Sequence, residues 1–148
     1  MKCIEVPTIY KGDKRSVFLA GGITGCPDWQ SKLINLLRNE DIVIFNPRRK
    51  NFPIHDPTAA EEQIRWEYKY LRRANAVAFW FPKESVCPIA LYELGALSMT
   101  NKPLFVGVHP DYPRRRDVEI QIKLARPDIK IVYKLSSLAN QIREWLRK

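Results

Sequence analysis

Two glutamates, Glu67 and Glu93, each interrupt an apolar stripe on a predicted helix. The helical faces that contain them comprise Ala60, Ile64, Glu67 and Leu71 on the first helix, and Ile89, Glu93 and Ala96 on the second. An unpaired carboxylate is costly to bury. Each position is therefore a break in the pattern at the surface, half of a buried ion pair with Arg65 or Arg72, or a functional group. Two such positions on successive helices are harder to explain as accidents than one.

The surroundings of Glu93 favour a particular chemistry. Pro88 fits the first turn of its helix, so Glu93 lies in the early turns, where the helix dipole favours a negative charge. Gly95 and Ala96 beside it leave room for a substrate to approach. An ionised, poorly solvated carboxylate in such a place suits covalent catalysis at a sugar carbon.

The elements that must position these residues alternate along the chain. Short apolar segments at 16–21, 41–47, 75–82, 102–110 and 129–134 alternate with helical patterns at 27–40, 59–74, 88–101, 114–125 and 136–148. This alternation predicts an α/β fold: a doubly wound, five-stranded parallel sheet, flavodoxin-like or Rossmann-like, flanked by helices. We expect a single domain over 1–148, in which 1–15 is the segment least open to assignment. Ligands bind such sheets at the carboxyl ends of the strands.

Two loops at that edge carry further candidates. Gly21 and Gly22, in "AGGITG", form either a ligand cradle or a tight turn, since the segment is neither GxGxxG nor a Walker A loop. Asn46, Arg48 and Arg49 leave the second strand at the same edge, and arginine forks suit phosphate or carboxylate. Adjacent arginines cannot easily both face inward, so one is expected to be solvated.

Composition narrows the classes of partner. The 25 Lys and Arg outnumber the 16 Asp and Glu, and the resulting net charge of +9 favours phosphate-bearing partners. Nucleic acid is not an expected partner, because no helix-turn-helix, RRM, KH or zinc-finger signature is present. No apolar run is long enough to span a bilayer, and no signal peptide precedes the first strand. Three scattered cysteines favour a reducing cytoplasm and argue against structural zinc.

Three segments resemble one enzyme family. "VFLAGG", "ANAVAFWFP" and "ALYELGALSMTNKPLFVGV" are similar to the nucleoside 2-deoxyribosyltransferases and their deoxynucleoside 5'-monophosphate N-glycosidase relatives, from residue 16 to about 110. The resemblance implies that Glu93 is the nucleophile that attacks the anomeric carbon of a 2'-deoxynucleoside. It implies that Glu67, at the matching separation, protonates the departing base. It also implies a homo-oligomer in which neighbouring subunits complete the site, and no metal or organic cofactor.

Three positions depart from the family pattern. Phe18 stands where transferases carry a tyrosine that orients the nucleophile. Cys87 stands where they have an aspartate for the sugar hydroxyl and the monophosphate glycosidases a serine. Ile23 replaces one of the aromatics that clamp the base. The full set of expected substrate contacts is Phe18, Gly21, Gly22, Ile23, Asn46, Arg48, Arg49, Cys87 and Pro88.

The leading interpretation is an enzyme that cleaves or exchanges the N-glycosidic bond of a deoxynucleoside or its monophosphate. Arg48, Arg49 and the positive charge lean towards a phosphorylated substrate. A non-catalytic nucleotide-binding module is the alternative, and nucleic-acid binding rests on charge alone. Cys87 as a nucleophilic thiol is a further alternative, although neither His55 nor His109 is tied to it by a motif.

Overall fold

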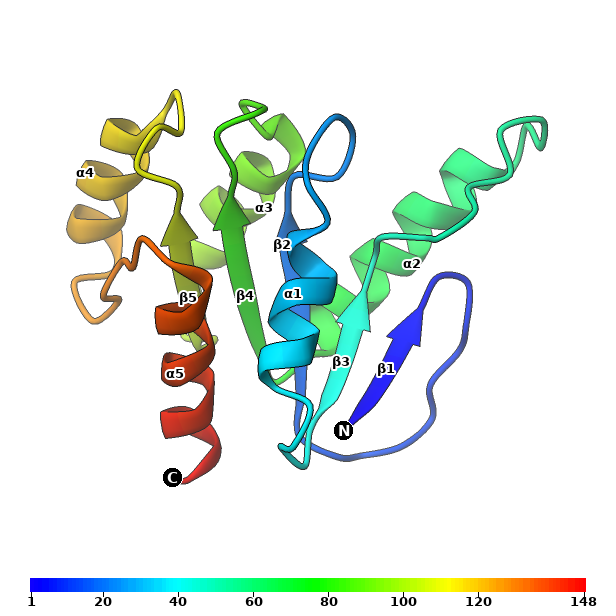
Figure 1. Cartoon of the computed structure of the whole chain (residues 1–148), viewed down its shortest axis with the longest axis horizontal. Helices are drawn as coiled ribbons and strands as arrows, with labels where there is room; N and C mark the ends of the chain where they lie inside the picture. The colour runs from blue at the N-terminus through cyan, green and yellow to red at the C-terminus, as the bar shows by residue number, and fades with distance from the viewer.

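A computed structural model of the chain describes residues 1–148 and contains one parallel sheet. Its strands are β1 (Lys2–Glu5), β2 (Ser16–Gly21), β3 (Val43–Asn46), β4 (Ala76–Phe81) and β5 (Leu104–Val108). The order across the five-stranded sheet is β1-β3-β2-β4-β5, and every neighbouring pair is parallel (Figure 1). Because β2 has β3 on one side and β4 on the other, the winding of the chain reverses at β2. This reversal places the switch point of the fold between β2 and β4.

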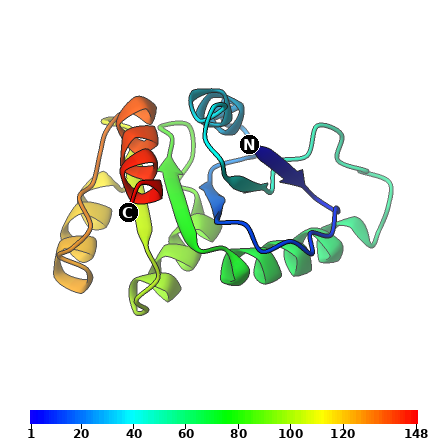
Figure 2. The same cartoon turned by 90° about the horizontal axis from the view of Figure 1, so that it is seen from below.

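Helices cover both faces of the sheet. They are α1 (Trp29–Leu36), α2 (Ala59–Arg73), α3 (Pro88–Ser98), α4 (Arg115–Ala125) and α5 (Leu135–Leu146). Figure 2 shows α1 and α5 on one face, and α2, α3 and α4 on the other. The predicted doubly wound α/β fold is therefore confirmed. None of these helices combines the length and the apolar character needed to cross a bilayer.

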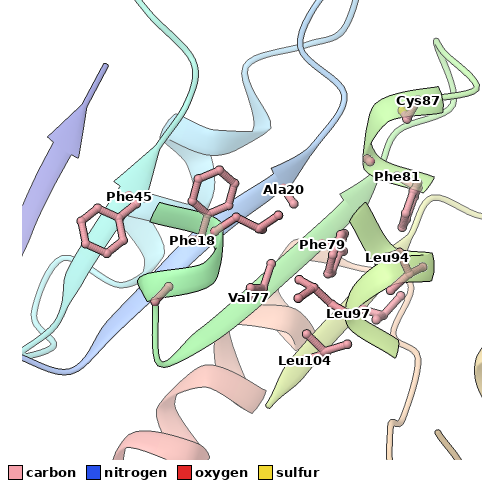
Figure 3. Packing of buried hydrophobic residues seen from close by; sticks show 14 of the residues in the cluster. Phe18, Ala20, Phe45, Val77, Phe79, Phe81, Cys87, Leu94, Leu97 and Leu104 are labelled. Atoms are coloured by element: carbon pink, nitrogen blue, oxygen red, sulfur yellow. The ribbon is translucent and has the colours of Figure 1, made fainter. Parts of the chain in front are cut away.

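The two central strands are apolar on both sides because both sides are covered. All six residues of β4, "AVAFWF", are buried, and β2 is buried up to its last residue. On the face of α2 and α3, Phe18 and Phe79 pack with Leu94 and Leu97 in one cluster, as the labelled side chains of Figure 3 show. The opposite face holds a second cluster, which joins Trp29 and other α1 residues to α5.

The number of strands was predicted correctly, but one strand was misplaced. The segment 129–134 is not a strand: it makes a single bridge, Gly107 to Val132, before α5 begins. The fifth strand is β1, inside the segment 1–15 that sequence patterns left unassigned. β1 lies at the sheet edge with two of its four residues exposed, so it lacks the apolar run of a central strand.

Two helical predictions also need correction. The helix expected over 27–40 is shorter: Asp28 caps it, accepting a hydrogen bond from the Ser31 backbone N–H at 3.1 Å, so Pro27 precedes the helix. The apolar stripes that contain the two glutamates are mostly turned away from the sheet, and Leu71 is their one buried apolar residue. Ile64 is 64% exposed and Ile89 is 65% exposed. The buried residues of α2 are Ala59, Trp66, Tyr70 and Leu71.

Candidate active site

A cavity of about 310 Å³ opens at the switch point, above the carboxyl ends of β2 and β4. Three parts of the chain supply most of its wall: the end of β2 with the loop that follows, the loop after β4, and the first turns of α3. Glu67 reaches the cavity from α2 and Pro47 from the end of β3. The lining residues are Phe18, Ala20, Gly21, Gly22, Ile23, Thr24, Pro47, Glu67, Ser85, Cys87, Pro88, Ile89, Ala90 and Glu93.

The structure brings together most of the residues expected at the site from the sequence. Those that line the cavity are Glu67, Glu93, Phe18, Gly21, Gly22, Ile23, Cys87 and Pro88. Asn46, Arg48 and Arg49 do not line it. The lining residues that sequence patterns did not single out are mainly chain neighbours of predicted ones, such as Ser85 in the β4–α3 loop and Ala90 in the first turn of α3, for which the adjacent predicted residue was the available signal.

Glu67 and Glu93 are half-buried and affect one another electrostatically. The pKa of Glu93 is raised to about 7, chiefly by burial and additionally by the negative charge of Glu67, while the Arg72 cation opposes the rise. Burial also raises the pKa of Glu67, and a hydrogen bond from Gln63 opposes that rise. Both carboxyls also line a second hollow between α2 and α3. Close to neutral pH the pair can therefore hold a proton and donate or accept it, as general acid–base chemistry requires.

The wall formed by the β2–α1 loop is held tightly in place. A Cβ on Gly22 would lie 2.6 Å from the Cys26 sulfur and 3.0 Å from the Cys87 sulfur. The Gly22 carbonyl accepts hydrogen bonds from the Trp29 indole at 2.8 Å and from the buried Gln30 amide at 3.2 Å. The glycine is thus required by close packing, and its carbonyl is already occupied.

Arg48 completes this wall from outside the cavity. Its guanidinium donates to the carbonyls of Pro27 at 2.8 Å and Cys26 at 2.9 Å, and to the Gln30 side chain at 3.1 Å. The Asn46 side chain, also buried, accepts from the Arg48 backbone N–H at 3.0 Å. These two residues therefore fasten the end of β3 to the β2–α1 loop.

Arg49 points elsewhere. It pairs with Glu62 of α2, and its side chain is largely buried in a separate shallow hollow next to Pro7. Its Nε has no hydrogen-bond partner. We expected one of the two arginines to be solvated. This expectation is wrong, because both guanidinium groups are bonded to protein atoms.

Cys87 occupies the N-cap position of α3 in the left-handed region, at φ 53°. This conformation is strained for a residue with a Cβ. Burial, chiefly, raises the pKa of the Cys87 thiol to about 11, so the thiol is uncharged near neutral pH. A protonated thiol is a poor nucleophile, which argues against the thiol alternative.

Phe18 and Ile23 give the cavity an apolar side. Phe18 is 1% exposed and packs against the Trp66 ring, with the ring centroids 6.1 Å apart. Its side chain has no hydrogen-bonding group, so it cannot donate a hydrogen bond to Glu93. No group of three His, Cys, Asp or Glu side chains is placed to hold a metal ion.

The protein is a doubly wound α/β domain that holds two carboxyls in a crevice at its switch point. Proteins of this class are suited to acid–base and nucleophilic chemistry on small molecules. A search of curated proteins returned no match. A family model described as nucleoside 2-deoxyribosyltransferase like matches residues 14–112, about two thirds of the chain. The chain belongs to this family, as its sequence resemblance led us to expect.

Proposed function

We propose that the protein cleaves or exchanges the N-glycosidic bond of a 2'-deoxynucleoside through a covalent intermediate on Glu93. The observation that carries the proposal is the meeting of Glu93 and Glu67 in one cavity of a protein of this family. The two carboxyls come from different helices and interact with each other. Side chains placed together in this way supply both a nucleophile and an acid.

The proposed reaction runs in two steps. In the first, an oxygen of the Glu93 carboxylate bonds to the anomeric carbon, and the bond from that carbon to the base nitrogen breaks. The bonding electrons leave with the base, and Glu67 supplies a proton to it. In the second step, water or another base bonds to the same carbon, the bond from that carbon to the Glu93 oxygen breaks, and the Glu67 carboxylate takes the proton that the attacking molecule loses. Water gives hydrolysis, and a base gives transfer.

The lining of the cavity supports a sugar without a phosphate. It contains two carboxyls and neither Lys nor Arg. The donors of Arg48, which favoured a phosphorylated substrate on sequence grounds, are engaged with Pro27, Cys26 and Gln30. We therefore place deoxynucleosides before their 5'-monophosphates as substrates.

The test compares the wild-type protein with Glu93→Ala and Glu93→Gln on a panel of deoxynucleosides and monophosphates, with and without a second free base. We expect base release or exchange by the wild type and a loss of at least about a hundredfold in both variants. Mass spectrometry of the quenched wild type should detect a deoxyribosyl adduct on the peptide that contains Glu93. Equal activity of the wild type and Glu93→Ala would remove Glu93 from the mechanism.

A non-catalytic nucleotide-binding module is the second candidate function. It is favoured by Phe18 and Cys87, because neither can form the strong hydrogen bonds of the hydroxyl or carboxyl groups expected there. Calorimetry would detect nucleoside binding in either case. Binding without turnover of any member of the panel would support the module and refute the enzyme.

We also propose that the protein assembles with copies of itself through the face of α2 and α3. α3 is apolar nearly all round, which is typical of a helix that is buried on every side. The sheet nevertheless covers only part of it, and the exposed Ile89 and Tyr92 share a hollow with the exposed Ile64 and Tyr68 of α2. Sedimentation analysis should show a dimer or larger, and Tyr92→Glu should shift it towards the monomer. A monomeric wild type would refute this assembly.

A further inference from the structure

Gln63 joins the end of β3 to one of the two carboxyls. It lies one helical turn before Glu67 on α2, a spacing that brings the two side chains together. Its Nε2 donates a hydrogen bond to the Pro47 carbonyl at 2.6 Å and another to Glu67 Oε1 at 3.2 Å. Pro47 lines the cavity beside Glu67, so both contacts of Gln63 are made at the cavity wall.

The Pro47 carbonyl fixes which way the Gln63 amide faces. If the amide were turned over, its Oε1 would face two acceptors, the Pro47 carbonyl and the Glu67 carboxyl, and both hydrogen bonds would be lost. In the observed orientation Oε1 is buried and has no partner. The side chain thus leaves a buried acceptor unsatisfied, which is unfavourable, while it keeps both donor contacts.

The bond to Glu67 makes its two carboxyl oxygens unequal. Oε1 accepts a hydrogen bond from Gln63, so a proton on Glu67 is carried by Oε2. When that proton leaves, negative charge develops on a carboxylate that already has a donor in place. A donor prepared in advance of charge development stabilises the transition state for proton transfer.

We propose that Gln63 is a positioning residue that orients Glu67 so that Oε2 delivers its proton to the departing base. This inference rests on the proposed function, in which Glu67 is the acid. The step transfers one proton from Oε2 to a base nitrogen, which also receives the electrons of the broken glycosidic bond. Glu67 is left as a carboxylate that still accepts from Gln63.

The pH dependence that follows has a definite sign. Burial raises the pKa of Glu67 and the Gln63 hydrogen bond lowers it, so loss of this bond moves the pKa up. An acid acts only while it is protonated, so the rate should fall at high pH as Glu67 ionises. This fall, the upper limb of the rate profile, should therefore move to higher pH. The titratable or charged groups that share the cavity or the adjoining hollow with Glu67 are Glu93, Cys87, Tyr68, Arg72 and Tyr92. All of these remain in place when Gln63 alone is changed.

The experiment uses two variants of Gln63 and one matched control. Gln63→Glu keeps the shape of the side chain but removes both amide donors, and Gln63→Leu removes its polarity. Gln141→Glu makes the same chemical change on α5, where the Gln141 amide donates to the Lys130 carbonyl at 2.8 Å, far from the cavity. Rates of base release or exchange are measured against pH, and thermal melts establish that each variant is folded.

We expect kcat to fall by about tenfold in both Gln63 variants, a part of what a general acid contributes, and to be unchanged in Gln141→Glu. The upper limb should move to higher pH in Gln63→Leu and further in Gln63→Glu, which adds a negative charge beside Glu67. A lower kcat with an unmoved limb would mean a merely structural role and would overturn the proposal. If the limb moves while kcat is kept or raised, the proposal is also overturned, since Gln63 would then change the pKa of Glu67 without orienting its carboxyl.

The role of Gln63 and the proposed function can be refuted separately. If Glu93→Ala and Glu67→Gln lose activity while Gln63→Glu matches the wild type, only the role of Gln63 is wrong. If Glu93→Ala keeps full activity, the proposed function itself is wrong.

Discussion

Replacing Glu67 with glutamine should move the acid limb of the reaction to lower pH. Glu93 must be ionised to attack, so activity is lost as the pH falls through the pKa of Glu93, about 7. The negative charge of Glu67 contributes to that high value, and Glu67→Gln removes the charge while nearly keeping the shape. The ionised form of Glu93 should therefore persist to lower pH in the variant.

The size of the shift follows from the causes of the high pKa. The pKa of Glu93 is raised from 4.5 to about 7, and burial is the largest cause, ahead of Glu67. Removing the second cause should lower the limb by on the order of one pH unit, equivalent to about 1.4 kcal/mol. Arg72 gives a control of opposite sign, because its cation lowers the pKa of Glu93. Arg72→Met should move the same limb to higher pH.

The assay is the initial rate of base release or exchange between about pH 4 and pH 9, fitted for each variant to its own plateau. Glu67→Gln also loses the proposed acid, so its plateau should be lower, but the position of the limb does not depend on the plateau height. An unmoved limb in Glu67→Gln would refute the electrostatic coupling of the two glutamates. A downward shift in Arg72→Met would refute the role given to the arginine.

Three further outcomes are expected from the walls of the cavity. Arg48→Met should raise KM about tenfold or more for a deoxynucleoside and its monophosphate alike, because it removes charge-assisted hydrogen bonds to the β2–α1 loop. A rise in KM for the monophosphate alone would instead mean that Arg48 contacts the phosphate. Gly22→Ala should destabilise the fold by about 1–3 kcal/mol, because its Cβ would lie 2.6 Å from the Cys26 sulfur, and an unchanged melting temperature would contradict this. Cys87→Ser should keep activity, with KM equal or lower, because the thiol is uncharged near neutral pH; an inactive folded variant would restore the thiol alternative.

The central part of the fold was open to prediction because both sides of β2 and β4 are covered. Strands in that position must be apolar throughout, and they are recognisable as short apolar runs between helical patterns. The edges of the sheet were not open to prediction in the same way. β1 has exposed residues, and the segment 129–134 has a strand-like pattern but pairs at one residue before α5 begins. The burial of an edge segment depends on its neighbours as well as on its own pattern.

At the site, likewise, the sequence predicted where residues lie better than it predicted which groups they contact. Strand ends located the loops that carry Gly22 and Cys87, and both line the cavity. The sequence placed Arg48 at the correct edge, but it did not reveal that the backbone carbonyls of the neighbouring loop take its donors. Gln63 was missed, although its spacing of four residues before Glu67 was a usable signal. Hydrogen-bond partners depend on three-dimensional contacts that residue types alone do not specify.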